Sequence, residues 1–392
     1  MLFSLALILS IGMLSEKICQ KLNLPPLLGM LITGIVLGPS VFNQIDTSIL
    51  NVSADLRKIA LIIILIRAGL TLNLDDLKKV GRPALLMCFV PACFELTGSL
   101  LLGTSLLHLS LLDSAILGSV LAAVSPAVIV PKMVQLIEED YGKEHSIPQL
   151  ILAGASVDDV VVIVLFSTFT ALAKGGDVNF TKFINIPISI VLGILIGLIL
   201  GKSFAKYFKK YHLRDTSKVF IFLAIAFILC TLEDAIPFSI TFSALLAIMA
   251  MGIGIQRENK NLALHLSTKF NKLWIIAQIF LFVLVGASVD LTYLSHIGIH
   301  CFIFLVGILI FRSIGVLICL IKTKLNKKER IFCMIAYLPK ATVQASIGGL
   351  PLAMGLTCGD LVLTMAVLAI LITAPLGAFL IDHTYQKLLT KD

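Results

Sequence analysis

Long apolar segments recur along the whole chain and are separated by short polar loops. Each segment is close to the ~20 residues that a helix needs to cross the ~30 Å hydrocarbon core of a bilayer. The predicted spans are 2–20, 24–41, 56–74, 83–107, 111–135, 148–172, 184–206, 217–233, 237–255, 270–290, 296–321, 330–353 and 359–381. The pattern therefore predicts an all-α polytopic membrane protein of about thirteen transmembrane helices, with residues 382–392 as a short tail.

Composition supports this class, because 58% of the residues are hydrophobic, 14% are charged and the mean hydropathy is +1.03. The net charge of +8 would suggest nucleic acid in a soluble protein, but here the basic residues lie mainly in loops between spans. We therefore expect a lipid bilayer and no nucleic acid as partner. The eight cysteines lie mostly in apolar segments without CxxC spacing, which indicates core residues and no metal framework.

The basic residues also predict how the chain is oriented. In the loops on one side, only Arg57, Lys58, Lys174 and Lys182 are basic, whereas almost all other Lys and Arg residues lie in the loops on the opposite side. By the positive-inside rule, we expect the N-terminus outside and the C-terminus in the cytoplasm. We expect the protein to lie in the cytoplasmic (inner) membrane.

Two adjacent carboxylates, Asp158 and Asp159, interrupt the middle of the span at 148–172. One ionised side chain at the centre of a spanning helix costs about 2.5–3.5 kcal/mol on insertion scales. We therefore expect the pair to be neutralised by protons or a cation, or to line a wet cavity, and both arrangements indicate ion handling. The alternative, acids at a helix end, fits poorly with the apolar residues on both sides.

Two other spans carry a proline beside polar residues at mid-span: Ser125-Pro126, and Pro339 followed by Lys340 and Thr342. Proline removes a helix hydrogen bond and clashes with the preceding turn, so we predict helix breaks there, although either alone could be an ordinary kink. The two spans are seven apart and so run in opposite directions. Matching interrupted helices in oppositely oriented halves are typical of inverted-repeat secondary transporters with a midplane ion site.

We accordingly predict a single transporter unit over residues 1–381, built from two inverted-topology repeats with crossed, broken helices. The repeats would cover about 1–172 and 217–381, with a linker helix at about 184–206.

Four further charges, Glu95, Arg67, Arg312 and Lys340, lie inside predicted spans and are functional candidates if each has a partner. Glu95 and Arg312 lie on corresponding spans of the two repeats. Arg312 and Lys340 would compensate the acids and the carboxyl ends of half-helices. For Arg312, a static ion pair with Glu95 is the alternative. For Arg67 we expect a structural role as partner of an acid or of carbonyl groups.

Several stretches resemble the cation/proton antiporter superfamily, specifically its two-aspartate sodium/proton antiporters and, within these, the NHA branch. The stretches are LPPLLG at 24–29 with GP at 38–39, LIRAGL at 65–70, VSPAVIVP at 124–131, SVDD at 156–159 and PKATVQA at 339–345. They run from the second predicted span to the twelfth, so the resemblance covers nearly the whole chain.

The resemblance implies a homodimer with elevator-like motion of a core domain (83–172 and 296–381) against a dimerisation domain (2–74 and 217–290). It also implies that Asp158 and Asp159 bind the ion, with Asp159 as the direct ligand. Arg312 stands where many two-aspartate members carry a lysine that is often assigned a proton-carrying role. Because an arginine stays protonated, proton stoichiometry does not transfer from those relatives.

These residues predict secondary active exchange of Na⁺ (or Li⁺) for H⁺ by alternating access, with a role in pH homeostasis. A small alkali cation prefers hard oxygen ligands, which Asp158, Asp159, Ser125, carbonyls around Val124 and water could supply. Protons and the cation would compete for the same carboxylates. Because moving a bare anionic site past an apolar barrier is expensive, the loaded forms would move more easily.

Other function classes fit less well. K⁺/H⁺ antiport in the same superfamily goes with a Gln-Asp pair, and sodium-coupled solute symport would need a solute-binding polar cluster. A channel needs polar residues along several helices, and an aspartyl protease needs facing carboxylates, whereas adjacent residues on one helix diverge by roughly 100°. We find no G-x-x-x-x-G-K-[ST] loop, and expect neither enzymatic activity nor a cofactor beyond the transported ions.

Overall fold

The computed structural model describes residues 1–22, 24–72, 81–174, 180–211, 213–235, 242–289 and 291–391. Over these ranges the regular structure is helical, apart from one bridging residue pair, Tyr141 with Lys391. The predicted span ends at 74, 237 and 290, and the last tail residue, lie outside the described residues.

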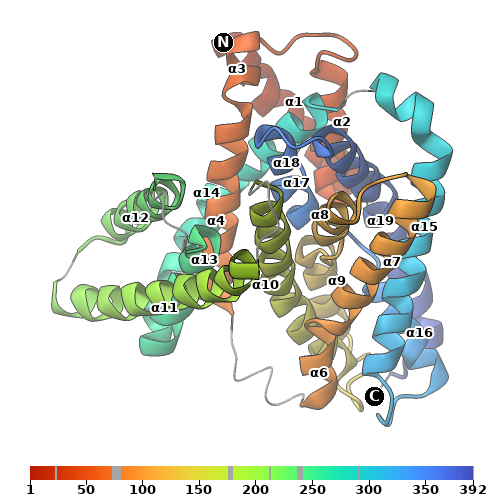
Figure 1. Cartoon of the computed structure of the whole chain (residues 1–392). Coiled ribbons are helices and arrows are strands. Elements are labelled where there is room, and N and C mark those ends of the chain that lie inside the picture. The colour runs from red at the N-terminus through yellow and green to blue at the C-terminus, as the bar shows by residue number, and fades with distance from the viewer. Residues whose placement is uncertain are drawn as a thin grey trace. The chain divides into compact units, whose positions relative to one another are not determined.

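The helices follow one another along the chain with short connections (Figure 1). Their bounds are α1 Leu2–Lys21, α2 Pro26–Leu37, α3 Thr47–Asn51, α4 Ser53–Thr71, α6 Arg82–Met87, α7 Val90–Leu106, α8 Leu111–Leu121, α9 Pro126–Glu138, α10 Ile147–Lys174, α11 Phe180–Lys210, α12 Asp215–Ala235, α13 Ala244–Glu258, α14 Lys260–Ala287, α15 Leu291–Cys319, α16 Lys327–Ala336, α17 Thr342–Ile347, α18 Leu350–Ala353 and α19 Gly359–Leu388. Within the described ranges, nine helical stretches are long and apolar enough to cross a membrane. The count of thirteen spans stays a prediction.

The chain divides into two compact units. The first unit comprises residues 1–55, 74–162 and 279–392, and the second comprises 56–73 and 163–278. The prediction assigned residues 2–74 to the dimerisation domain, whereas this division places residues 1–55 in the same unit as most of the predicted core domain. The two predicted domains therefore stay a prediction.

In the first unit, α15 runs beside α7, and α19 packs on α16, α17 and α8 (Figure 1). A fully buried apolar cluster joins α9, the first half of α10 and α16 through residues such as Ile129, Ile151 and Phe332. Because protein interiors are close-packed, this cluster fixes α10 against the two interrupted helices.

In the second unit, α11 packs along α13, and α12 also contacts α13. Gly201 and Gly254 face each other at the α11–α13 crossing, where an added Cβ on Gly201 would lie 3.0 Å from the Cα of Gly254. Small residues allow this close backbone approach, which is a common way of packing helices in membranes.

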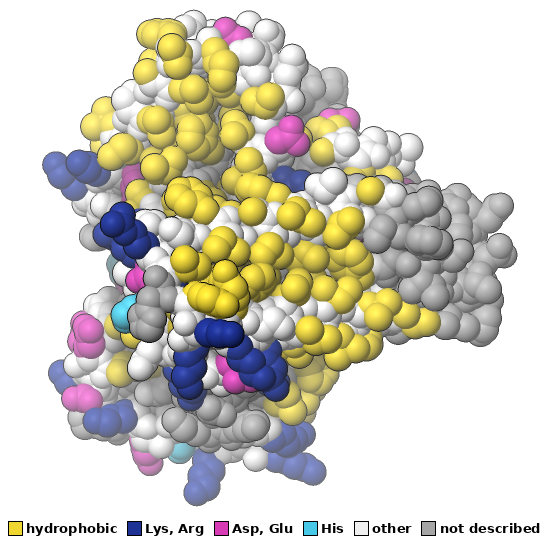
Figure 2. Space-filling view, turned by 90° about the vertical axis from the view of Figure 1, so that its left-hand side faces the viewer, with side chains coloured by type: hydrophobic (Ala, Val, Ile, Leu, Met, Phe, Trp, Pro, Cys, Tyr) yellow, Lys and Arg dark blue, Asp and Glu magenta, His cyan; other side chains and the backbone are white. Residues whose placement is uncertain are grey.

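Large hydrophobic side chains are exposed along α11 and α12, including Val191, Ile199 and Phe220. Figure 2 shows broad areas of hydrophobic side chains on one face of the molecule. Monomeric soluble proteins rarely expose apolar areas of this kind, whereas lipid tails are their natural surroundings. The pattern agrees with a membrane-embedded protein.

Two helices are interrupted in the first unit. One stops at Leu121 and resumes at Pro126, and the other stops at Ala336 and resumes at Thr342. Pro126 opens α9, where its missing N–H is no loss. The two interruptions touch, because the Ser125 backbone N donates to the Pro339 carbonyl over 2.8 Å.

The span predicted at 83–107 is found as one apolar stretch, Arg82–Leu106, but the structure divides it into α6 and α7 around Cys88 and Phe89. Pro91 lies in the first turn of α7, where it cannot continue the hydrogen bonds of a preceding helix. Conversely, Pro131 does not end α9, although it lies inside it.

The loop that leads into α10 is held by the C-terminal end of the chain. Gly142 N donates to the Thr390 carbonyl over 2.9 Å, and Tyr385 Oη donates to Glu139 Oε2 over 3.2 Å. Lys132 Nζ pairs with Asp382 Oδ2 at 2.5 Å. The start of the acid-bearing helix is therefore anchored to α19 and the residues after it.

A second anchor of this loop is an ion pair. His145 Nδ1 lies 2.9 Å from Glu329 Oε1, and Glu329 is buried while also capping α16 with Asn326. The hydrogen bond that the His145 ring donates to Glu329 raises the pKa of His145 above its ordinary value of 6.5; the nearby Glu144 favours the same direction, and Lys324 opposes it. The charged imidazolium is thus stabilised in the folded protein.

We expect His145→Gln to lower thermal stability more at pH 5.5 than at pH 9. A histidine whose pKa is raised on folding contributes stability that is full below pH 6.5 and lost as pH rises through the folded pKa. The expected difference in the shift of melting temperature is on the order of 2 °C. Thermal unfolding of purified protein across this pH range measures it, with His383→Gln, on exposed His383, as control. An equal shift at both pH values would contradict the assignment.

Candidate ion-binding site

The two predicted acids lie next to each other on α10 but in different surroundings. Asp158 is fully buried, whereas Asp159 is partly exposed. Neighbouring side chains on a helix diverge by roughly 100°, so the two carboxylates meet different partners. The structure therefore separates the pair into a buried acid and a more accessible one.

Asp158 binds the first interruption. Its Oδ2 atom accepts from the backbone N of Val124 over 2.8 Å and from Arg312 Nη2 over 2.9 Å. The Val124 N–H, which the broken helix leaves without a helical partner, is thereby satisfied. Asp158 thus helps to hold the interruption between α8 and α9 in place, and Arg312 compensates its negative charge.

Arg312, on α15, is fully buried and joins four elements. Its Nη1 donates to Glu95 Oε2 over 2.8 Å, and its Nε donates to the Tyr337 carbonyl over 2.7 Å. The Ala122 carbonyl accepts from Nη1 as well. The planar guanidinium offers five donors in a fixed fork, which suits this set of two carboxylates and two carbonyls.

Lys340, in the second interruption, is the other buried cation of the site. Its Nζ lies 2.6 Å from Glu95 Oε1 and 2.5 Å from the Leu121 carbonyl, and its backbone N donates to Thr373 Oγ1 over 2.9 Å. Cations at the carboxyl end of a helix are favourable, because the last carbonyls and the helix dipole are negative there. Lys340 and Arg312 thus stabilise the buried carboxyl end of α8.

Sequence reasoning missed Gln344, which lies on α17 and is fully buried. Its Nε2 donates to the Ala123 carbonyl over 2.9 Å, and lies 3.3 Å from the carbonyls of Val120 and Leu121. The signal in the sequence was a polar residue two positions after Thr342, inside the predicted span that contains the second interruption. The carbonyls from Val120 to Ala123 thus already accept hydrogen bonds from Gln344, Lys340 or Arg312.

We expect Gln344→Met to destabilise the protein by about 1–3 kcal/mol, because buried carbonyls at the end of α8 would lose their donor. Thermal unfolding of purified protein in detergent measures this. Ser346→Ala is the matched control, since the Ser346 hydroxyl bonds only to Thr342 O within the same helix. Unchanged stability of Gln344→Met, or an equal loss in the control, would contradict the capping role.

The buried charges form a balanced set around Asp159. Glu95 and Asp158 supply two carboxylates, and Arg312 and Lys340 supply two cations in direct contact with them. Asp159 makes no ion pair with any residue that the structure describes, and its buried Oδ1 has no hydrogen-bond partner there. An ionised Asp159 would therefore be an uncompensated charge inside the protein, which favours a proton or a cation on it.

Two further buried oxygens near this position also lack hydrogen-bond partners within the described residues: Ser125 Oγ and Asp158 Oδ1. Buried polar atoms are nearly always paired, so orphaned oxygens indicate a missing partner. Carboxylate and hydroxyl oxygens suit a hard cation. In the described part of the chain, no group of three or more His, Cys, Asp or Glu could hold a metal ion. A cation here would thus also need carbonyl or water ligands.

The remaining predicted residues have other positions. Pro126 and Thr342 open α9 and α17, and Pro339 lies in the second interruption, where its carbonyl accepts from Ser125 N. Arg67 lies on α4, in the second unit, and is not part of the Glu95–Arg312–Lys340 network. Its expected structural role stays a prediction.

Known proteins resemble this chain over nearly its whole length. The family model described as "Sodium/hydrogen exchanger, transmembrane" matches residues 5–386. Sodium/hydrogen exchanger 9B2 of Mus musculus is 35% identical over 385 residues, which are 94% of this chain and 69% of the relative. Sodium/hydrogen exchanger 9B1 of Homo sapiens is 31% identical over 410 residues, covering 100% of this chain and 78% of the relative.

A solved structure shows the same fold. The sodium proton antiporter MjNhaP1 from Methanocaldococcus jannaschii at pH 8 superimposes with a TM-score of 0.83 at 22% identity, covering 98% of this chain and 97% of that one. The predicted all-α antiporter fold is confirmed. The two inverted repeats stay a prediction.

Proposed function

Because this chain belongs to the sodium/hydrogen exchanger family, an integral membrane transporter family, we propose that it exchanges Na⁺ or Li⁺ for H⁺. The observation that carries the proposal is the charge balance of the site. Two carboxylates and two cations neutralise each other in direct contact, while Asp159 stands outside these pairs, with one oxygen that has no hydrogen-bond partner among the described residues.

In this proposal, Asp159 is the group that binds either the proton or the cation. A proton or a Na⁺ ion neutralises it, and the two compete because they occupy the same carboxylate. Ser125 Oγ and Asp158 Oδ1 supply further oxygens to the cation. The Glu95–Arg312–Lys340–Asp158 network holds both helix interruptions in place while the load changes.

Exchange then follows from the cost of moving charge. An empty, ionised Asp159 would add a net negative charge to the site, which is expensive to carry past an apolar barrier. The protonated and cation-loaded forms lack that charge and cross more easily. Alternating access of a core domain, with elevator-like motion, would complete the cycle. Arg312 does not release a proton, so the exchanged proton is assigned to a carboxylate.

Three further features belong to the proposal. The chain forms a homodimer through the predicted dimerisation domain. It lies in the cytoplasmic membrane with its N-terminus outside and its C-terminus in the cytoplasm, as the distribution of Lys and Arg favours. Its substrates are Na⁺ and H⁺, and its chemistry needs no resident cofactor and no enzymatic step.

The test is transport by the purified wild-type protein in liposomes with an imposed pH gradient. Equal concentrations of Na⁺, Li⁺ or K⁺ are added outside, and a pH-sensitive dye reports the gradient. We expect Na⁺ and Li⁺ to dissipate it and K⁺ to leave it nearly unchanged, with empty liposomes as the control. A response to K⁺ alone would indicate K⁺/H⁺ exchange instead, and no response to any cation would overturn the proposal.

A further inference from the structure

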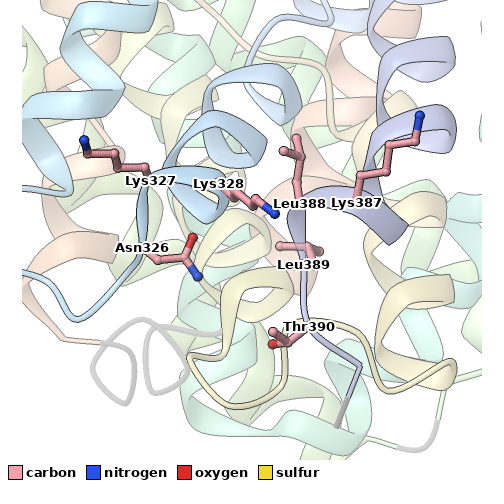
Figure 3. A pocket seen from close by; sticks show the side chains of 7 residues that line it. All are labelled: Asn326, Lys327, Lys328, Lys387, Leu388, Leu389 and Thr390. Carbon is pink, nitrogen blue, oxygen red and sulfur yellow. The ribbon is translucent and has the colours of Figure 1, made fainter.

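A cavity of about 560 Å³ lies in the first unit, away from the acids, between the start of α16 and the end of α19. Asn326, Lys327 and Lys328 line one side, and residues from Lys387 to Thr390 line the other (Figure 3). The volume falls in the usual range of small-molecule sites, roughly 300–1,000 Å³. Two segments about 60 residues apart in the sequence thus border one open hollow.

The charge of this cavity is one-sided. Lys327, Lys328 and Lys387 are all exposed, and none of the three has an ion pair with a residue that the structure describes. No carboxylate is among the described lining residues. In Figure 3 the Lys328 side chain extends from α16 toward the tail, while Lys327 and Lys387 extend outward on its two sides.

The nearest buried acid on α16 does not neutralise these lysines. Glu329 Oε2 accepts from Asn326 N over 2.7 Å, and Oε1 lies 2.9 Å from His145 Nδ1. Both carboxylate oxygens are therefore already engaged. The positive-inside rule explains lysines in this loop, but it does not require two distant segments to gather them around one cavity.

We propose that this cavity binds a phosphate group, carried either by a lipid headgroup or by a soluble phosphate compound. Each lysine ammonium supplies three donors and no acceptor, which suits the oxygens of a phosphate, and Lys328 extends toward the tail. The Asn326 side-chain amide and the Thr390 hydroxyl add neutral polar groups at the rim. The apolar surface of Leu388 would suit the glycerol or acyl portion of a lipid.

The position of the cavity gives binding a consequence for the chain. Thr390, which lines it, accepts the hydrogen bond from Gly142 that holds the loop before α10. A bound phosphate would fix Lys387 and the tail relative to α16, and thereby strengthen that anchor.

The test is phosphate binding by the full-length purified protein, which does not depend on transport. Melting temperature in detergent is measured with increasing inorganic pyrophosphate, and separately with increasing phosphatidylglycerol, or phosphatidylcholine for comparison, added as mixed micelles. The variant is Lys328→Gln/Lys387→Gln, and the matched control is Lys324→Gln/Lys210→Gln, which removes two exposed lysines outside the cavity. Size-exclusion chromatography checks that both variants remain folded.

We expect the cavity variant to weaken binding of one or both probes by about 25-fold, taking about fivefold for each lysine, and the control to change it less than the cavity variant does. A selective loss with pyrophosphate identifies a soluble phosphate, and a selective loss with phosphatidylglycerol identifies a lipid headgroup. Equal losses in cavity and control variants, or no loss with either probe, would overturn the proposal.

Discussion

Replacing Asp159 with asparagine is expected to reduce sodium-driven proton movement in proteoliposomes to the level of empty liposomes. The amide keeps the size of the side chain but cannot take up a proton or carry a negative charge toward Na⁺. In the wild type, Asp159 is the acid left over after Glu95 and Asp158 are paired with Arg312 and Lys340. Loss of this carboxylate therefore removes the group that binds the proton or the cation. The network of paired charges stays in place.

The matched control is Asp360→Asn, which changes an exposed acid at the start of α19 in the same way. This variant should transport at the wild-type rate. Because Asp159 makes no ion pair with any residue that the structure describes, the Asp159→Asn protein should also melt no earlier than the wild type. Substantial transport by folded Asp159→Asn protein would contradict the assignment.

Replacing Arg312 with methionine is expected to destabilise the protein by about 3–5 kcal/mol, which is the usual cost of breaking a buried ion pair by removing one partner. Glu95 and Asp158 would each lose a contact at 2.8 or 2.9 Å, and the Tyr337 carbonyl would lose its donor. Thermal unfolding in detergent measures the change. Much of the variant should fail to purify as a folded protein.

Arg312→Lys separates charge from geometry in the same experiment. The ammonium keeps the positive charge but cannot reach two carboxylates and two carbonyls from one planar fork. We therefore expect a loss of stability between those of wild type and Arg312→Met. Wild-type stability of Arg312→Met would contradict the buried network, and wild-type stability of Arg312→Lys would show that charge alone suffices.

The spans and their interruptions could be read from the sequence because each leaves a local signal. Hydropathy predicted the nine long apolar stretches found in the described ranges, and Ser125-Pro126 and Pro339 lie where α8 and α16 give way to α9 and α17. The interruption between α6 and α7 was missed. Pro91 lay among apolar residues there, without a polar neighbour to distinguish a break from a kink.

The partners of the charges could not be read in the same way. Helical spacing places Glu95, Arg312 and Lys340 inside spans, but it does not say which of them meet. The structure shows that Glu95 is shared by Arg312 and Lys340, and that Arg312 also binds Asp158. One guanidinium thus contacts both Glu95 and an acid of the pair.

Gln344 was missed for a related reason. Its amide caps carbonyls of α8, more than 220 residues earlier in the chain. Such a contact depends on how two interrupted helices cross, and no periodicity within either helix encodes it. Polar residues beside a predicted break in a membrane helix are therefore candidates for capping the other break.

The most direct test of the account is the number of protons released when Na⁺ binds. Calorimetric titration of the purified protein with NaCl, in buffers of different ionisation enthalpy near the working pH, gives this number. If Na⁺ and H⁺ compete for Asp159, Na⁺ binding releases protons from the wild type, and Asp159→Asn neither binds Na⁺ comparably nor releases protons. Na⁺ binding without proton release, or unchanged binding in Asp159→Asn, would contradict it.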